Sequence, residues 1–224
     1  MGPNSVNKLE ALGLVVGPVL ALIFFAIEPG GMFVQPADST DPAATITAVA
    51  SNPGIARVTA LMVPLGLILM LYGLSGMSRV MRPDTMAAAW SRLGILFMNV
   101  GAFGWILTSG LTFILTRTQL DAAQGLESAI PIYMVDSGMG MLSSMAVAAG
   151  FMAFNLGLSA IYPPGSLRIT ALAIAAVSVV CLIAVIIGNS VPDRTMITVS
   201  RICYFPWVAW SVVLGVRFLK GRSL

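Results

Sequence analysis

Asn99 and Asn155 are the side chains of this sequence whose type and position most suggest a specific contact. Each lies inside a long apolar stretch, and the two fall at a similar distance from the ends of their stretches. An amide surrounded by hydrocarbon seeks a partner, and a hydrogen bond between membrane helices contributes about 0.6–2 kcal/mol. We predict that the two amides approach each other or share a backbone group. The alternative is a ligand site that Trp105 helps to line.

Several kinds of chemistry are excluded by the residues that the sequence lacks or misplaces. It has no histidine, which removes the usual ligand for haem and copper and the commonest general base. Its lysines, Lys8 and Lys220, lie at the ends of apolar stretches, so a retinal Schiff base in mid-membrane is excluded. No carboxylate lies in the middle of a stretch, which argues against a proton relay. We expect no enzymatic activity and no cofactor beyond structural lipids.

The sulfur-containing residues are best interpreted as packing residues. Cys181 and Cys203 lie at different depths, so we expect two buried, inert thiols and no disulfide. Met139, Met141 and Met145 carry thioethers that can bind copper(I), but no histidine or cysteine pair accompanies them. Packing is therefore the favoured role of these methionines.

Charged residues gather near the ends of the apolar stretches on one side. We expect them to form ion pairs, which contribute little when they are solvated, or a shallow polar mouth. The residues are Glu28, Arg57, Arg117, Asp136 and Arg201.

The composition is that of a membrane protein. The chain has 224 residues, of which 58% are hydrophobic and 9% are charged, whereas soluble domains carry about 25% charged residues. About 20 residues of helix cross the hydrocarbon core of a bilayer, and a helix satisfies its own backbone groups there. The sequence therefore predicts an all-α polytopic bundle forming a single membrane domain over residues 1–224. The six predicted spans are 11–28, 58–77, 93–115, 138–161, 169–188 and 199–219.

The basic residues predict the orientation of these spans. With the N-terminus inside, the inner segments hold Lys8, Arg79, Arg82, Arg92, Arg168, Arg217, Lys220 and Arg222. The outer segments hold Arg57, Arg117, Arg194 and Arg201. Because Lys and Arg accumulate on the cytoplasmic side, both termini are expected in the cytosol.

Two outer loops, 29–56 and 116–137, are long enough to hold structure, as a simple cap, a lid or a partner contact. Asp41 followed by Pro42 is typical of a helix start and predicts a short helix over 42–51. We expect a second short helix before Pro131. No basic stripe with interleaved aromatic residues is present, so nucleic acid is not an expected partner.

Small residues and prolines predict how the spans pack. Gly13 and Gly17, and likewise Ala146 and Gly150, have the spacing that brings two membrane helices close together. Pro18, Pro64 and Pro206 are expected to bend their helices.

A short repeat relates the two halves of the chain. "RVTAL" at 57–61 and "RITAL" at 168–172 each open an apolar stretch. Since each half holds three spans, a duplicated unit would be inverted, which is an arrangement used by transporters. The alternative is that both are generic transitions from interface to lipid. Neither half shows a clearly broken helix with charged groups at the midplane, which argues against an ion-coupled carrier.

The layout resembles a family of small six-span bacterial integral membrane proteins of unknown function. The resemblance is carried by an outer helix before "ARVTALMVPLGLILMLYGLSGMSRVMR" and by the short basic loop after it. It covers most of the length and implies no substrate, cofactor or reaction.

These observations lead to two hypotheses about function. The first is a non-catalytic accessory or structural subunit of a larger membrane assembly. Its partners would be other membrane protein subunits and membrane lipids, in the bacterial inner membrane. The alternative is a small permease for a neutral or lipid-like solute, built from two inverted three-span repeats and holding a cavity near Asn99, Asn155 and Trp105.

Overall fold

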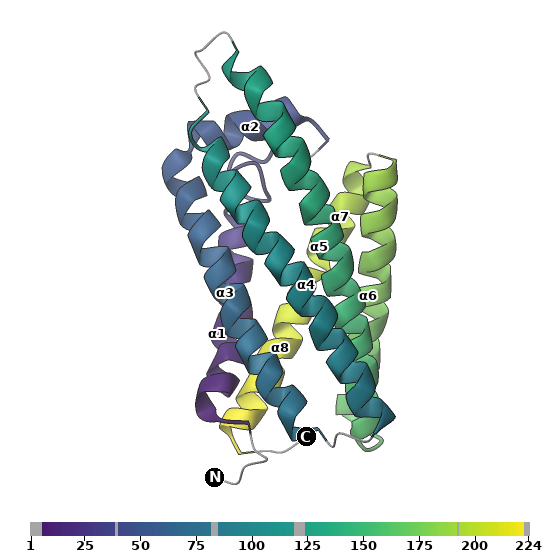
Figure 1. Cartoon of the computed structure of the whole chain (residues 1–224). Coiled ribbons are helices and arrows are strands. Elements are labelled where there is room, and N and C mark those ends of the chain that lie inside the picture. Colours follow the sequence, from purple (N-terminus) through teal and green to yellow (C-terminus); the bar gives the residue numbers. More distant parts are fainter. Residues whose placement is uncertain (1–5, 39, 82–84, 119–123, 192, 222–224) are drawn as a thin grey trace.

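The computed structural model of the chain describes residues 6–38, 40–81, 85–118, 124–191 and 193–221. These residues form a bundle of roughly parallel and antiparallel helices without a β-strand (Figure 1). The helices are α1 (Lys8–Ala26), α2 (Pro42–Ser51), α3 (Pro53–Val80), α4 (Met86–Leu115), α5 (Gly125–Ile161), α6 (Ser166–Ser190), α7 (Arg194–Ile202) and α8 (Tyr204–Leu219).

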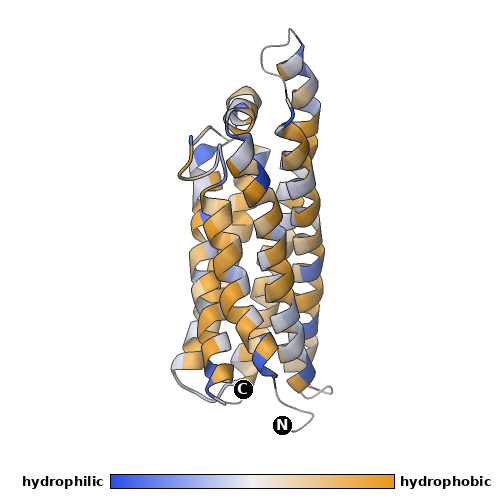
Figure 2. Ribbon diagram, turned by 90° about the vertical axis from the view of Figure 1, so that its left-hand side faces the viewer, coloured by the Kyte–Doolittle hydropathy of each residue, from blue (hydrophilic) through white to orange (hydrophobic). Residues whose placement is uncertain are grey.

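Among the described residues, six helical segments are long and apolar enough to cross a membrane, which confirms the predicted all-α, six-span fold. Five are α1, α3, α4, α5 and α6, and the sixth is the α7–α8 segment Arg194–Leu219. Apolar residues follow the helices along their length, and hydrophilic residues gather toward their ends (Figure 2). A bilayer requires this distribution, because its hydrocarbon core surrounds the middle of each helix and its polar headgroups surround the ends.

The outer segments contain one expected helix and one correction. α2 occupies the range predicted for a short helix, and the Asp41 side chain caps it by accepting a hydrogen bond from the Ala44 N–H at 3.1 Å. The predicted separate helix before Pro131 is wrong, because α5 runs through this proline without a break. Proline removes one backbone donor, while the buried Ala129 and Tyr133 hold the turns on both sides of it in the same packed cluster.

Glycines bring the main helix pairs into backbone contact. A Cβ added to Gly13 or Gly17 of α1 would lie 2.5 Å from the α3 backbone, at Leu69 O and Met70 N respectively. A Cβ on Gly150 of α5 would lie 2.8 Å from Gly94 O of α4. The predicted close contacts of Gly13, Gly17 and Gly150 are therefore confirmed.

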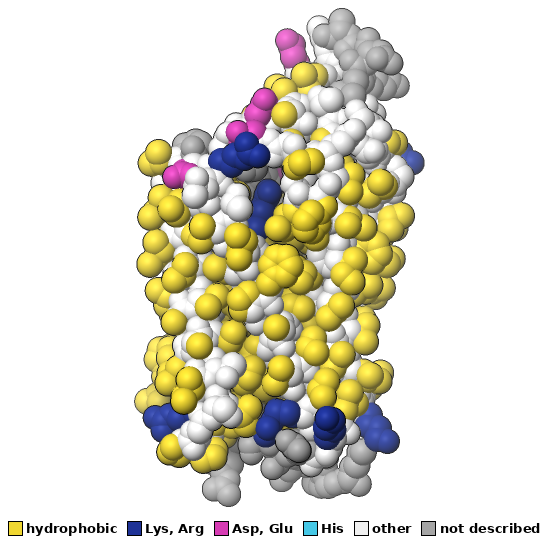
Figure 3. Space-filling model, turned by 180° about the vertical axis from the view of Figure 1, so that it is seen from behind, with side chains coloured by type: hydrophobic (Ala, Val, Ile, Leu, Met, Phe, Trp, Pro, Cys, Tyr) yellow, Lys and Arg dark blue, Asp and Glu magenta, His cyan; other side chains and the backbone are white. Residues whose placement is uncertain are grey.

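Both termini lie at one end of the bundle, which we call the terminal end (Figure 1). The face seen in Figure 3 shows Lys and Arg side chains at both ends, with a row of them at the terminal end, whereas its Asp and Glu side chains lie toward the other end. We call that other end the outer end, following the orientation predicted from the basic residues, which stays a prediction. Arg82, Asp84, Asp121 and Arg222 lie outside the described residues.

An ion pair ties α1 to α3 near the terminal end. The Glu10 side chain is 1% exposed and pairs with the Arg79 guanidinium. Glu10 also accepts a hydrogen bond from the Asn7 N–H at 2.9 Å, and Asn7 accepts one from the Glu10 N–H at 2.8 Å. This reciprocal cap holds the buried carboxylate in place for Arg79.

Removing the arginine is expected to destabilise the bundle. Arg79→Ala leaves the Glu10 carboxylate buried without its base, so we predict a loss of about 1–3 kcal/mol in the free energy of unfolding. Thermal unfolding of the purified protein measures the effect. Arg168→Ala removes an exposed arginine at the same end and serves as the control. Equal unfolding temperatures for the two variants would contradict the role given to the pair.

Candidate functional site

The outer half of the bundle encloses a cavity of about 310 Å³. This volume lies at the small end of the range for ligand pockets, roughly 300–1,000 Å³. Side chains from α1 through α8 and from the segment after α1 line it. The cavity changes in character with depth. Along α5 its lining runs from Asp136 through Ser144 to Val147 and Phe151, so the mouth is polar and the deep wall is apolar.

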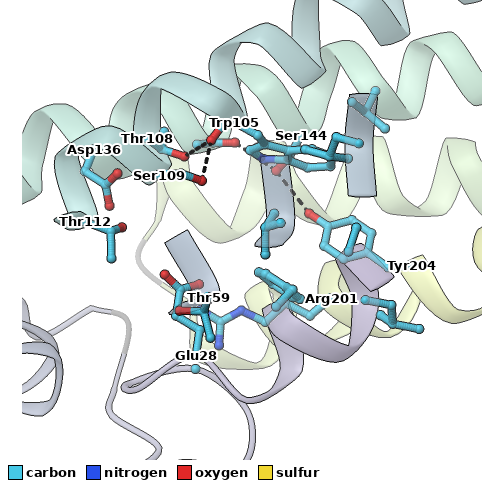
Figure 4. Close-up of a pocket in the computed structure, with 18 of the residues that line it drawn as sticks. Glu28, Thr59, Trp105, Thr108, Ser109, Thr112, Asp136, Ser144, Arg201 and Tyr204 are labelled. Carbon is cyan, nitrogen blue, oxygen red and sulfur yellow. Dashed lines mark hydrogen bonds between the residues drawn. The ribbon is translucent and has the colours of Figure 1, made fainter. Parts of the chain in front are cut away.

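Three charged side chains line the mouth of the cavity. Glu28 follows the end of α1, Asp136 lies on α5, and Arg201 lies in the last turn of α7. Figure 4 shows the Glu28 carboxyl group beside the Arg201 guanidinium, with Asp136 across the cavity near Thr112. Ionisable groups inside a membrane bundle are costly to bury and usually mark functional sites.

Glu28 is held in an environment that favours its neutral form. Burial raises the pKa of Glu28 to about 7, although the positive charge of Arg201 and a hydrogen bond with Thr112 oppose the shift. Desolvation therefore outweighs the attraction to Arg201. The carboxyl group can change its charge near neutral pH.

Asp136 has an unmatched acceptor atom. Its Oδ1 is buried and has no hydrogen-bond partner among the described residues. The Glu28 carboxyl group is close enough to repel it electrostatically. A buried polar atom without a partner is unfavourable, so Asp136 presents an acceptor into the cavity that a donor can satisfy.

Hydroxyl groups form the next layer below the charged groups, and their protons are already donated within the protein. Thr108 Oγ1 and Ser109 Oγ both donate to the Trp105 carbonyl, at 2.9 and 3.0 Å (Figure 4). Ser144 Oγ donates to the Gly140 carbonyl at 2.8 Å and lies 3.1 Å from the Tyr204 hydroxyl. Since Ser144 has a single proton, the Tyr204 hydroxyl is the donor in that contact.

Aromatic rings form one wall of the cavity. The Tyr204 ring lies edge to face with Trp105, at 5.7 Å between centroids, and with Phe25, at 5.5 Å. Deeper in the bundle, Trp207 stacks on Phe151 at 4.6 Å. These contacts join α1, α4, α5 and α8 around the cavity.

A break in the sixth span places two of the lining residues. Helix α7 ends at Ile202 and α8 begins at Tyr204, with Cys203 between them. Pro206 cannot donate to the Ile202 carbonyl four residues earlier, which accounts for the interruption. Arg201 and Tyr204 lie on the two sides of this break and both line the cavity. This interruption lies in the outer part of the segment Arg194–Leu219, so the expectation that neither half has a clearly broken helix with charged groups at the midplane stays a prediction.

The predicted site residues fall in three different places. Asn99 lies on the exposed face of α4. Asn155 is fully buried, where its Nδ2 donates to the Phe151 carbonyl at 2.8 Å and its Oδ1 accepts from Trp210 Nε1 at 2.7 Å. The predicted approach of the two amides is wrong, and neither residue lines the cavity. Of the three residues that the alternative hypothesis placed at a cavity, Trp105 alone is in the lining.

The charged residues expected at the outer rim divide into two groups. Glu28, Asp136 and Arg201 converge on the cavity. The other two, Arg57 and Arg117, place their guanidinium groups 6.0 and 5.8 Å from the Phe113 ring centroid, which is cation–π distance. All three charged residues of the site are visible in the sequence. The position of Asp136 in the bundle, however, depends on how far α5 extends before residue 138.

The sulfur-containing residues take structural positions. Cys181 and Cys203 are free and buried, and the Cys181 thiol donates to the Ser200 carbonyl at 3.6 Å. Met141 and Met145 pack against the main hydrophobic core, and Met141 also lines the cavity. These positions fit the packing role predicted for the thioethers.

Glu28 gives the stability of the protein a pH dependence whose sign follows from its raised pKa. The pKa is about 7 in the folded protein against a reference value of 4.5, so folding favours the protonated carboxyl group. This contribution is fully present below the reference pKa and is lost as the pH rises through the folded-state value. We predict that Glu28→Gln flattens the decline in unfolding temperature over this window, measured by thermal scans at several pH values. Parallel profiles for the variant and the wild type would contradict the assignment.

Comparison with protein-family models, with curated proteins and with solved structures finds no match to this chain. The geometry of the cavity is therefore the guide to what the protein does.

Proposed function

We propose that this protein is a small permease whose solute enters the cavity from the outer end of the bundle. The observation that carries the proposal is a cavity of about 310 Å³ that three charged side chains line. A bundle that served only as a scaffold would gain stability by filling this space with apolar side chains.

The packing on either side of the cavity supports the proposal. Toward the terminal end the core is closed by fully buried side chains, including Leu14, Met77, Met98, Phe154 and Leu158. A solute site that is closed on one side is what alternating access requires of one of its states. The interrupted sixth span adds a second feature of transporters, since their solute sites commonly use broken helices.

The charged residues at the mouth indicate a different class of solute from the one that the sequence alone predicts. For a permease, the sequence alone predicts a neutral or lipid-like solute, but buried charges at a site favour a solute that can pair with them. The inverted three-span repeat stays a prediction within this proposal, as does the location in a bacterial inner membrane.

Labelling from both sides of the membrane tests whether the protein is a permease. In a background of Cys181→Ser and Cys203→Ser, Ser109→Cys places a thiol in the cavity. We expect a membrane-impermeant methanethiosulfonate to react with it in both right-side-out and inside-out vesicles, because a permease exposes its site to each side in turn. Leu107→Cys, on the exposed face of α4, is the control and should stay unlabelled. Reaction from the outer side alone would indicate binding without passage and would contradict the proposal.

A non-catalytic accessory subunit is the second candidate, and the length of α5 favours it. The helix has 37 residues, which at about 1.5 Å per residue exceeds the ~30 Å hydrocarbon core by a wide margin. Its first turns rise above the rest of the bundle (Figure 1), and Met134 and Val135, further along the same helix, are exposed. A partner subunit would cover such a surface.

Native mass spectrometry after purification in mild detergent distinguishes this second candidate. A subunit should leave the membrane with a companion protein, and a charged residue in Val135→Lys should release that companion. Recovery of the chain alone would contradict the subunit role and would leave the permease proposal intact.

A further inference from the structure

The hydrogen-bonding capacity left over at the cavity identifies the kind of solute that it accepts. The hydroxyl protons of Thr108, Ser109, Ser144 and Tyr204 are all donated to other protein atoms. Each of these oxygens keeps lone pairs that can accept a hydrogen bond. These four hydroxyl groups therefore present acceptors to the cavity and no free proton.

The charged groups at the mouth also indicate a solute that supplies hydrogen-bond donors. Arg201 is the basic side chain of the lining, and its charge acts on Glu28 (Figure 4). Asp136 lies across the cavity, is repelled by Glu28, and keeps a buried Oδ1 without a partner among the described residues. Because Glu28 already lies beside Arg201, Asp136 is the carboxyl group at the mouth whose hydrogen-bond partner a solute can supply.

The aromatic wall and the depth profile complete the description. Trp105 and Tyr204 present ring surfaces within the cavity, and such surfaces attract cations at distances within about 6 Å. Below them the lining becomes apolar on three helices, with Leu67 and Met70 from α3, Phe151 from α5 and Trp207 from α8. A solute that is charged at one end and apolar at the other matches this gradient.

We propose that the cavity binds a primary amine with a hydrocarbon or aromatic body, whose ammonium group donates to Asp136 and to the hydroxyl oxygens. A primary ammonium group carries three N–H donors and no acceptor, which complements the acceptors that these hydroxyl groups present. The apolar body extends toward Phe151 and Trp207. This assignment rests on the proposed solute cavity and names the class of solute that it takes.

Calorimetric titration of the purified protein in lipid nanodiscs tests the proposal with three probes of similar size. Phenethylammonium has the charge and the donors, phenethyl alcohol lacks the charge, and N,N,N-trimethylphenethylammonium has the charge without an N–H group. We expect phenethylammonium to bind at least about tenfold more tightly than either of the others, as charged hydrogen bonds of this kind allow. This comparison uses the wild-type protein and does not depend on the folding of a variant.

A carboxylate variant then locates the ammonium group. Asp136→Asn should weaken phenethylammonium binding at least about tenfold. Glu127→Gln removes an exposed carboxylate from the same helix, outside the cavity lining, and should bind as the wild type does. Unchanged affinity in Asp136→Asn would overturn the assignment of the ammonium position.

The outcomes separate this inference from the proposed function. Equal binding of the alcohol and the ammonium would overturn the amine proposal and would leave a permease for neutral solutes. Absence of binding by all three probes would also overturn it, while the two-sided labelling of Ser109→Cys would still decide whether the protein is a permease.

Discussion

Gly94→Leu is expected to prevent assembly of the bundle. A Cβ at Gly94 would lie 2.5 Å from Phe154 N and 2.6 Å from Gly150 O, both backbone atoms of α5. Backbone cannot rotate out of the way as a flexible side chain can, so the two helices would have to separate. Overpacking of a well-packed core costs about 1–3 kcal/mol for a few methylene groups. We expect Gly94→Leu to exceed that range, because contact between α4 and α5 would be lost along their length.

Gly110→Leu is the matched control for this prediction. Gly110 lies on the same helix, and a Cβ added there meets nothing within 4 Å. Size-exclusion chromatography in detergent should show a folded, monodisperse protein for Gly110→Leu and aggregated or absent protein for Gly94→Leu. Two variants of equal yield and equal unfolding temperature would show that α4 and α5 do not pack as described.

Asn155→Leu is expected to have the second-largest effect. The substitution removes the acceptor of the Trp210 indole N–H, which is fully enclosed between α5 and α8. An unsatisfied buried donor costs about 1–3 kcal/mol, and the bond between the two helices is lost with it. Thermal unfolding should therefore show a clear decrease in the unfolding temperature.

Asn99→Leu makes the same chemical change, but we expect it not to destabilise the protein. Its side chain lies on the exposed face of α4, where the surrounding solvent is hydrocarbon. Replacing an amide there by an apolar side chain should leave the stability unchanged or raise it. If Asn99→Leu destabilised the protein as much as Asn155→Leu does, the rotation of α4 about its axis would have to be revised.

The contrast between the two asparagines shows where prediction from the sequence stops. Hydropathy locates the six spans, because apolar length is what a bilayer selects. Hydropathy predicts the rotation of each span about its own axis poorly. Lipid is as apolar as the protein interior, so both faces of a membrane helix carry similar residues. The positions of Asn99 and Asn155 within their spans therefore predict that the two lie close together. In the structure Asn99 lies on an exposed face and Asn155 is buried. The glycines at 94 and 101, which both meet α5, were the signal that α4 turns its Asn99 face outward.

The cavity was harder to predict because it depends on how far helices extend. The sequence suggested that the fourth span starts at residue 138, after Asp136 and Pro131. In the structure α5 starts at Gly125, so Asp136 becomes part of the bundle wall instead of a loop. The charges themselves were visible in the sequence as candidates for a polar mouth. Their convergence required the tertiary arrangement of α5, α7 and the segment after α1.

The central claim is that a six-span bundle opens its cavity toward the outer side of the membrane. Reporter fusions to the C-terminus, which lies at the end opposite the cavity, test it most directly (Figure 1). In a bacterial host we predict a fluorescent fusion with green fluorescent protein and an inactive fusion with alkaline phosphatase, because the C-terminus is expected in the cytosol. An active phosphatase fusion with a dark fluorescent protein would place the cavity on the cytoplasmic side and contradict the account.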